Sequence, residues 1–247
     1  MRWDRALLEE ALGVPVVVYD VVDSTMTEAA ADPRAPLVHL AEEQRAGQGR
    51  HGRVWASPAG NLYATVAWPE GADPFPAALL AAIQVAWAEA IAGAGGPTSR
   101  CKWPNDGVLG GGKWSGLLAR RVADGGSRLL VGLGANLERA PRLAAVLQPV
   151  ALRDHWAPWP GRAAVGALLL DAALGVLRGG AAAVHERLTR WPRYDAFQIG
   201  AELRVDTPEG EQRGRYLGLS PDGRLRLEVD GADIQIAVGE AHAVRPA

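Results

Sequence analysis

The densest group of reactive side chains in this sequence lies between residues 102 and 113. Lys102, Asn105 and Asp106 belong to the segment Lys-Trp-Pro-Asn-Asp, and a glycine-rich run then ends at Lys113. Two ammonium groups beside a carboxamide and a carboxylate can hold an anionic small molecule together with the phosphates of a nucleotide. The residue types therefore predict an anion-binding site at this turn.

Two glycine-rich segments match known phosphate-binding patterns only in part. Residues 107–113 have the spacing of a P-loop, but Trp114 follows where a magnesium-binding Ser or Thr is needed. Residues 47–52 fit G-x-G-x-x-G, but Pro58 and Gly60 disfavour the helix that a Rossmann site requires. A glycine loop with Arg50 and Arg53 can still bind phosphate or carboxylate. A solvated basic turn and a plain hairpin are the alternative interpretations.

Composition bounds the class of protein. The 247 residues, 48% of them hydrophobic, can form one large core and a second small one. A net charge of −2 gives no indication of a nucleic-acid partner. The single cysteine, Cys101, excludes an internal disulfide and indicates a cytoplasmic protein. We expect no signal peptide, no membrane span and, from the scattered histidines, no structural metal.

The elements that position the reactive residues mix strands and helices without a regular βαβ repeat. We expect strands at residues 14–22, 37–41, 62–68, 114–120 and 129–133, with another entering residue 102 and a turn at 124–126. Helices are expected at residues 26–31, 76–92, 163–178 and 181–190, the first with a capping box from Thr25 to Glu28. This order predicts an α+β fold with a mixed sheet packed against helices.

The last fifty or so residues differ from the rest. Four short strands are expected at residues 201–206, 213–219, 224–229 and 233–238, separated by Pro/Gly and Asp-Gly turns. This pattern predicts a small β-barrel-like domain. We therefore expect two domains, residues 1–198 and 199–247.

Several candidate residues are ambiguous when taken singly. Ser24 and Thr25 suit helix N-caps as well as ligand contacts. Gln44 could bind a ureido group, or could merely be polar. Cys101 could be a nucleophile, but a packed structural cysteine is the favoured interpretation. Trp55, in the glycine-rich loop, is a candidate for covering a ligand.

The motifs taken together and in order resemble those of the biotin–protein ligases. They are Asp-Ser-Thr at 23–25, the Gln-to-Trp loop at 44–55, Lys-Trp-Pro-Asn-Asp at 102–106, Lys-Trp-Ser-Gly at 113–116 and Gly-Leu-Gly-Ala-Asn at 132–136. The resemblance runs from the first strand to the terminus. It implies a class II synthetase-like catalytic domain followed by a C-terminal SH3-like β-barrel.

The resemblance also implies roles for individual residues. Biotin would be bound by Ser24, Thr25, Gln44, Gly47, Arg50, Lys113 and Gly116. ATP and the adenylate would be bound by Arg53, Trp55, Asn105, Asp106 and Asn136, with Trp55 as a shield and Asn136 on adenine. Lys113, Arg50 and Lys102 would be catalytic, with Lys113 the main electrostatic catalyst.

The implied reaction has two steps, with biotin and Mg²⁺-bound ATP as substrates. The biotin carboxylate attacks the α-phosphorus and gives biotinyl-5′-AMP. A lysine of a biotin carboxyl carrier domain of a biotin-dependent carboxylase then displaces AMP, with Asp106 or Lys102 assisting the acceptor amine. Two residues depart from the family pattern: Met26 replaces an Asn, and Gln48 replaces a frequent Arg.

Other functions remain open at this point. A lipoate or octanoate ligase or transferase shares the superfamily, and the transferase would use Cys101. A non-catalytic biotin sensor is the alternative that Met26 and Gln48 could favour. Some family members repress transcription, but 13 residues before the first expected strand are too few for a helix-turn-helix, so we expect no specific DNA binding. Pairing of sheet edges leaves a homodimer open.

Overall fold

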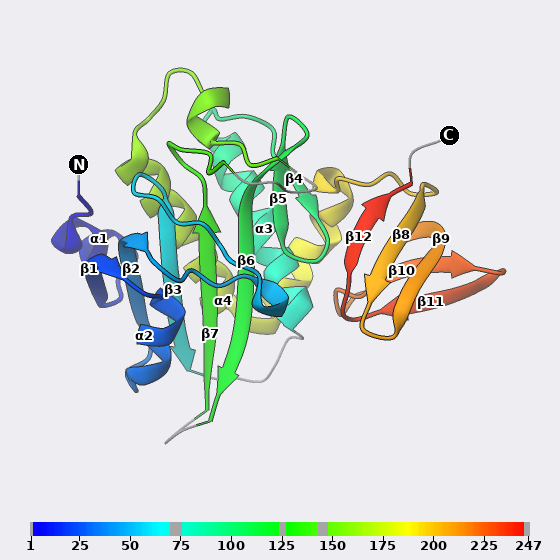
Figure 1. Ribbon diagram of the computed structural model, residues 1–247, viewed down its shortest axis with the longest axis horizontal. Coiled ribbons are helices and arrows are strands. Elements are labelled where there is room, and N and C mark those ends of the chain that lie inside the picture. Colours follow the sequence, from blue (N-terminus) through cyan, green and yellow to red (C-terminus); the bar gives the residue numbers. More distant parts are fainter. Residues whose placement is uncertain (1, 70–75, 124–126, 143–147, 245–247) are drawn as a thin grey trace.

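The chain forms two β-sheets that stand side by side (Figure 1). The computed structural model describes residues 2–69, 76–123, 127–142 and 148–244. A seven-stranded sheet takes up the N-terminal and central parts of the chain, and a five-stranded sheet takes up the C-terminal part. The turn expected at residues 124–126 lies outside the described residues.

The seven-stranded sheet has the order β1-β2-β3-β7-β6-β5-β4. Its strands are β1 Val16–Val22, β2 Leu37–Gln44, β3 Leu62–Pro69, β4 Arg100–Lys102, β5 Asp106–Leu109, β6 Gly112–Val122 and β7 Arg128–Ala135. β1 and β2 run parallel, and the other neighbouring pairs run antiparallel. The sheet is thus mixed and lacks a βαβ repeat, which confirms the expected mixed sheet of strands and helices.

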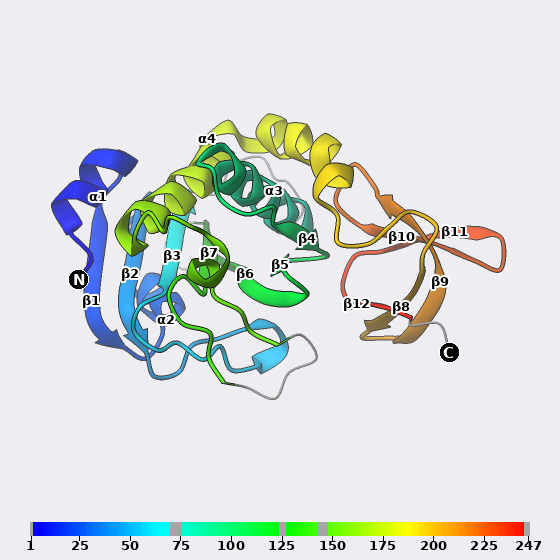
Figure 2. The ribbon, with the colours of Figure 1, turned by 90° about the horizontal axis from the view of Figure 1, so that it is seen from above.

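Helices cover both faces of this sheet (Figure 2). On one face lie α1 (Arg5–Leu12), α3 (Pro76–Gly93) and α4 (Arg162–Tyr194), whose buried side chains form the main core with the sheet. On the other face lies α2 (Thr25–Ala31), which packs a smaller cluster around Met26 and Ala29. The α4 segment breaks at Gly180, where φ is 57° and ψ is −146°. That break explains why the sequence predicts two helices there.

The C-terminal sheet has the order β11-β10-β9-β8-β12. Its strands are β8 Glu202–Thr207, β9 Gly210–Leu219, β10 Leu225–Val229, β11 Ala232–Ile236 and β12 Glu240–Ala243. Neighbouring strands are all antiparallel. β11 and β12 form opposite edges, so the described strands make an open sheet.

The structure corrects several local expectations. α1, capped by Asp4 and ended by Gly13 in the left-handed conformation, was not predicted. Neither was the four-residue strand β12. β1 is a half-buried edge strand, not a buried one. The N-cap of α2 is Ser24 and makes no side-chain cap, so the capping box expected from Thr25 to Glu28 does not form.

In the part of the chain that the structure describes, two helices are long and apolar enough to cross a membrane by length and composition alone. Pro76–Gly93 and Arg162–Tyr194 each contain an apolar window long enough to cross a bilayer. Both contribute many side chains to the core against the seven-stranded sheet. Their hydrophobicity is therefore explained by packing within the molecule.

Arg128, the first residue of β7, binds the C-terminal end of α2. Arg128 is buried, and its guanidinium donates to the carbonyl oxygens of Ala29, Ala30 and Asp32. These carbonyls have no partner within the helix, and a cation at this end also matches the helix dipole. Arg128 thereby fixes the helix whose first turn carries Thr25.

Two buried polar contacts dock the C-terminal sheet onto the rest of the molecule. The indole Nε1 of Trp103 donates to the carbonyl of Gly223 at 2.9 Å. Asp195, just after α4, accepts from Trp191 Nε1 at 2.7 Å and from the hydroxyl of Tyr216 on β9 at 2.6 Å. These contacts place β8 and β12 beside the turn that follows β4.

Candidate active site

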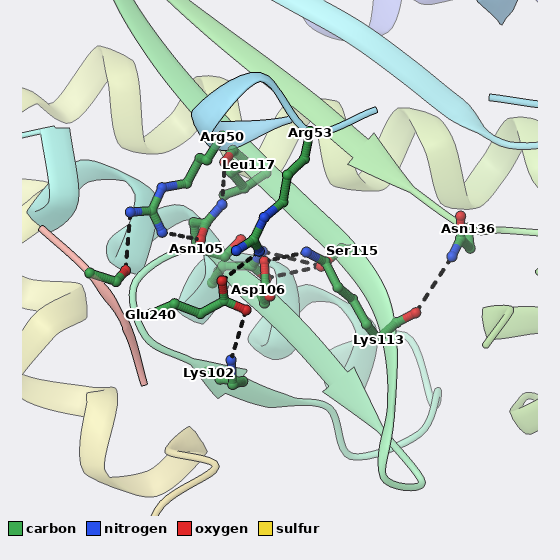
Figure 3. A network of polar contacts seen from close by, with 12 residues as sticks. Arg50, Arg53, Lys102, Asn105, Asp106, Lys113, Ser115, Leu117, Asn136 and Glu240 are labelled. Atoms are coloured by element: carbon green, nitrogen blue, oxygen red, sulfur yellow. Dashed lines mark hydrogen bonds and ion pairs between the residues drawn. The ribbon is translucent and has the colours of Figure 1, made fainter. Parts of the chain in front are cut away.

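A cavity of about 580 Å³ brings four parts of the chain together. Its walls come from the α2 start with the end of β2, the loop at residues 48–56, the glycine-bearing face of β6 and β7 with the β4–β5 turn, and the paired strands β8 and β12. Figure 3 shows the polar side chains that converge on this space. Its volume is in the usual range for small-molecule sites.

One part of the cavity carries a compact network of neutral polar groups. The amide N–H and Oγ1 of Thr25 lie 2.9 and 3.1 Å from Gln44 Oε1, to which both donate. Gln44 Nε2 donates to Ser57 Oγ at 3.0 Å, and Thr65 Oγ1 lies 2.9 Å from Thr25 Oγ1. The network fixes the orientation of each amide and hydroxyl. It can therefore present an ordered set of donors and acceptors to a small polar head group.

The floor of the cavity is formed by three glycines, Gly116, Gly132 and Gly134, on which Trp55 and Met26 pack. A Cβ at Gly134 would lie 2.8 Å from the Trp55 indole, and one at Gly116 would lie 2.9 Å from it. A Cβ at Gly132 would lie 2.9 Å from the terminal methyl of Met26. Real Cβ contacts are longer than this, so a side chain at Gly116 or Gly134 would displace the Trp55 ring, whereas the flexible end of Met26 could move aside from one at Gly132.

Four cationic side chains meet around the β4–β5 turn (Figure 3). Lys113 Nζ is 2.7 Å from Asp106 Oδ1 and 5.3 Å from the centre of the Trp55 ring. Arg50 donates to Asn105 Oδ1 at 3.2 Å. The remaining two cations, Arg53 and Lys102, both face the carboxylate of Glu240: Arg53 donates to it, and Lys102 Nζ lies 4.0 Å from it.

Burial shifts the pKa values of several charged side chains in this cluster. It lowers the pKa of Lys102, while the carboxylates of Asp106 and Glu240 oppose that change. It also lowers the pKa of the Arg50 guanidinium. Burial acts to raise the pKa of Glu240, but the hydrogen bond from Arg53 and the charge of Lys102 outweigh it and leave that pKa lowered. Partly desolvated cations attract an anion more strongly than they would in water.

The amides of the site differ in how far they are satisfied. Asn105 is fully engaged: Nδ2 donates to the Leu117 carbonyl at 2.6 Å and Oδ1 accepts from Arg50. Asn136 Nδ2 reaches only the Lys113 carbonyl, at 3.5 Å. Asn136 Oδ1 and Trp55 Nε1 are buried without a hydrogen-bond partner among the described residues. A polar ligand in the cavity could complete both groups.

Most of the residues predicted from the sequence line this one cavity. These are Thr25, Gln44, Arg50, Arg53, Trp55, Lys102, Asn105, Asp106, Lys113, Gly116 and Asn136. Ser24 and Gly47 are not among the lining residues. Ser24 is buried as the N-cap of α2. Gly47 supports the loop, since a Cβ there would lie 2.4 Å from the Trp55 carbonyl.

The sequence prediction missed a whole wall of the cavity. Arg204 and Asp206 on β8, and Glu240 and His242 on β12, are alternate residues of paired strands and line the same space. Gly239, just before β12, accepts from Arg50 at 3.1 Å. Gly239 and Glu240 stand at the start of a strand of four residues, and such a short segment gives no pattern from which a strand or a site can be predicted. These contacts join residues about 190 positions apart and could not be read from spacing.

The glycine run at residues 107–113 and the cysteine follow their structural interpretations, whereas Arg50 in the other glycine-rich segment lines the cavity and is not part of a solvated basic turn. Residues 110 and 111 form a hairpin turn between β5 and β6 with positive φ, and residues 47–52 are a loop with a single 3₁₀ turn, Arg50–Gly52. Cys101 is buried, and burial raises the pKa of its thiol. A thiol in this state is a poor nucleophile.

Sequence comparison places the chain among characterised enzymes. The sequence model of the Biotin/lipoate A/B protein ligase family matches residues 18–136. The chain is 30% identical to the bifunctional ligase/repressor BirA of Escherichia coli (strain K12), over 92% of this chain and 73% of the relative. It is also 30% identical to the biotin–[acetyl-CoA-carboxylase] ligase of Mycobacterium tuberculosis, over 85% and 79% of the two chains.

Structural comparison gives the same fold. The biotin protein ligase from Aquifex aeolicus, solved with biotin and ATP, aligns with a TM-score of 0.81 at 22% identity, over 94% of this chain and 99% of that one. The Leishmania major enzyme, solved with biotinyl-5-AMP, aligns with a TM-score of 0.59 at 21% identity, over 90% and 98%. The chain therefore belongs to the biotin/lipoate A/B protein ligase family and, within it, to the biotin–protein ligases.

Proposed function

We propose that this protein activates biotin with ATP to biotinyl-5′-AMP and transfers the biotinyl group to a lysine of a biotin carboxyl carrier domain. One observation carries the proposal. A single cavity holds both the neutral network of Thr25 and Gln44 and the cations Arg50, Lys102 and Lys113. Biotin has a neutral ureido ring at one end and a carboxylate at the other, and the carboxylate must meet the phosphates of ATP. One cavity must therefore offer a neutral polar environment and a cationic one close together.

The neutral network suits the ureido ring of biotin. A ureido group has one carbonyl acceptor and two N–H donors, and Thr25, Gln44 and Thr65, which line the cavity, offer hydroxyl and amide groups of both kinds. Met26 stands where the family pattern has an Asn and lies against Gly132. It contributes an apolar surface for the sulfur-containing ring instead of a hydrogen bond.

The cations account for the first step. The carboxylate oxygen of biotin forms a bond to the α-phosphorus of ATP while the bond to pyrophosphate breaks. Carboxylate and triphosphate repel each other, so Lys113 and Arg50 must offset that repulsion and stabilise the charge that develops on the phosphorus oxygens. We place Lys113 nearest the reacting atoms, because it stands between Asp106 and the Trp55 ring. Mg²⁺ arrives as part of the nucleotide substrate.

Trp55 and Asn136 are proposed to bind the adenylate. Both line the cavity, and each has a buried polar atom without a partner among the described residues. An amide can exchange two hydrogen bonds with the edge of adenine. Arg53, Asn105 and Asp106 lie beside the cations where phosphates would be held. Trp55 stands over the sheet glycines and would cover the mixed anhydride from water.

Gly134→Ala tests the assignment of this floor. The new methyl group would press on Trp55, so we expect the KM for ATP to rise about tenfold, roughly 1.4 kcal/mol of binding. Biotin-dependent pyrophosphate release at varied ATP measures it. Gly175→Ala is the matched control, because nothing lies within 4 Å of that position. An unchanged KM for ATP in Gly134→Ala would place the nucleotide elsewhere.

In the second step the acceptor amine attacks the carbonyl carbon of the adenylate, and AMP leaves. The sequence predicts Asp106 or Lys102 as the residue that assists this amine. Asp106 is ion-paired with Lys113 and Lys102 faces Glu240, so both also hold the cation cluster in place. The carrier domain is proposed as partner because relatives of this chain are named biotin–[acetyl-CoA-carboxylase] ligases.

Cys101→Ala separates this mechanism from that of a cysteine-dependent acyl transferase. The thiol is buried in the core and its pKa is raised by burial, so we expect biotin transfer within about twofold of the unmodified protein once folding is matched. Single-turnover transfer with both proteins measures this. Abolished transfer by a folded Cys101→Ala variant would make the cysteine the acyl carrier.

The remaining assignments follow the family resemblance. We infer two domains, residues 1–198 and 199–247, with the C-terminal sheet as an SH3-like barrel. We also infer a cytoplasmic enzyme. Edge strand β1 leaves room for pairing of two copies into a homodimer.

Pyrophosphate release tests the first half of the proposal. We expect release from Mg-ATP only when biotin is present, with lipoate and octanoate as parallel carboxylates. Release with octanoate or lipoate but not biotin would move the chain to the lipoate side of the family. Biotin binding without release would make the protein a sensor.

A further inference from the structure

The proposed second step needs a proton acceptor, and this inference rests on that step. A lysine amine carries a proton at neutral pH because its ordinary pKa is about 10.4. The ammonium has no lone pair with which to attack the adenylate. A side chain of the cavity that is neutral near pH 7 and can take up a proton would overcome this.

Two histidines line the cavity, and their surroundings differ. His51 is exposed, and its Nε2 lies 3.4 Å from the Arg50 guanidinium. The acidic candidates Asp106 and Glu240 are held in contacts with Lys113 and Arg53. His242 is the histidine that has a carboxylate beside it.

His242 is presented to the cavity by the edge of the C-terminal sheet. β12 pairs with β8, and alternate residues of the two strands face the cavity, whereas Ala241 and Val205 point into the core. His242 Nε2 lies 3.3 Å from Asp206 Oδ2, and the imidazole is 15% exposed. A carboxylate at one ring nitrogen favours a proton there and leaves Nδ1 as the basic atom.

We propose that His242 is the general base of biotin transfer, oriented by Asp206. The acceptor ammonium gives one proton to Nδ1 of His242, and the freed nitrogen lone pair forms the amide bond to the biotinyl carbon. The bond from that carbon to the phosphate oxygen breaks, and AMP leaves with its electron pair. The second proton lost from nitrogen goes to the departing phosphate or to water.

The surroundings of His242 favour its neutral form, and burial is the main cause. Burial lowers the pKa of His242, and the charges of Lys102 and Arg204 lower it further, while Glu240 and Asp206 oppose them. Because the pKa of His242 lies below the ordinary histidine value of about 6.5, its imidazole is mostly unprotonated at every pH above 6.5 and can accept a proton there. As pH falls through the lowered pKa, the base becomes protonated and transfer should slow.

The test measures the two half-reactions separately in the full chain. Adenylation is followed as pyrophosphate release, and transfer is followed as a single turnover of biotinyl-5′-AMP onto an apo carrier domain. We expect His242→Asn and His242→Gln to lower the ratio of transfer to adenylation about 10²-fold. Transfer by the variants should rise roughly tenfold per pH unit between pH 6.5 and 9, because bulk solvent must then deprotonate the lysine. The unmodified protein should level off instead.

A second nucleophile makes the assignment specific. Hydroxylamine is unprotonated at neutral pH, so the difference between His242→Asn and the unmodified protein should shrink to within about threefold when hydroxylamine replaces the carrier domain. Asp206→Asn should move the acidic limb of the transfer profile to lower pH, because Asp206 raises the pKa of His242. His185→Asn, an exposed histidine of α4, is the matched control.

Three results would overturn the proposal. The first is transfer by His242→Asn at the unmodified rate with an unchanged pH profile. The second is an equal loss of adenylation and transfer, and the third is a loss with hydroxylamine as large as with lysine; either of these two would give His242 a structural role. Failure of the unmodified protein in both half-reactions would instead contradict the proposed function.

Discussion

Lys113→Ala is expected to lower biotin-dependent pyrophosphate release by about 10²–10³-fold, or roughly 3–4 kcal/mol of transition-state stabilisation. The side chain is the cation placed between Asp106 and the Trp55 ring, above the glycine floor. Removing it leaves the repulsion between carboxylate and phosphate without its closest counter-charge. The loss should appear mainly in kcat, because the interaction strengthens as the phosphorus oxygens gain charge.

A matched variant separates local from general charge effects. Arg5 on α1 is an exposed cation whose ion pair is with Glu9, and neither residue lines the cavity, so Arg5→Ala removes one positive charge outside the cavity and should leave release unchanged. Circular dichroism should show that both variants are folded. Near-normal release by folded Lys113→Ala would refute the catalytic assignment.

Asp195→Ala is expected to lower the free energy of unfolding by about 3 kcal/mol and the melting temperature by roughly 8 °C. Asp195 accepts from Trp191 Nε1, Tyr216 Oη and the Phe197 amide. The first two donors are buried, so losing their acceptor leaves unsatisfied polar groups in the interior. Chemical denaturation measures the change. Asp171→Ala, at an exposed α4 position, is the control and should be neutral.

The same position has a defined pH dependence. Burial raises the pKa of Asp195 above its ordinary value, although three hydrogen bonds oppose the change. The folded protein therefore binds this proton more tightly than the unfolded chain. The stability advantage of the unmodified protein over Asp195→Ala should be largest at acidic pH and should decline as pH rises through the pKa of the folded state. An advantage that grows with pH would show that the pKa is lowered instead.

The contiguous motifs of the site could be predicted because each combines functional residues with the local structure that presents them. Lys102, Asn105 and Asp106 share one turn between two short strands, and Gly132 and Gly134 belong to one strand whose bare face is the cavity floor. Residues that are close in sequence then stay close in space. Through their resemblance to the family pattern, such motifs predicted eleven of the residues that line the cavity.

Contacts between distant segments could not be predicted in the same way. Glu240 meets Arg53 across 187 positions, and no periodicity in the sequence links the two. β12 is four residues long, shorter than any window in which alternation can be recognised. The docking of the C-terminal sheet depends on Asp195, a single carboxylate in a loop whose burial is set by α4 and β9 together.

The start of α2 shows a second limit on what can be predicted from the sequence. The spacing of Thr25 and Glu28 suited a cap, yet Thr25 instead gives its N–H and hydroxyl to Gln44. Tertiary hydrogen bonding outweighed the local preference. The same side chain that would have been an ordinary cap is thereby turned toward the cavity.

The most direct test of the central claim is the intact mass of an apo biotin carboxyl carrier domain after incubation with this protein, biotin and Mg-ATP. The chain contains two lysines, Lys102 and Lys113, and both line the cavity, so the acceptor is the main source of surface lysines in the mixture. The account predicts addition of one biotinyl group to the carrier domain, absent without ATP and absent when its acceptor lysine is replaced. An unmodified carrier domain, in a reaction where a known biotin–protein ligase modifies it, would contradict the account.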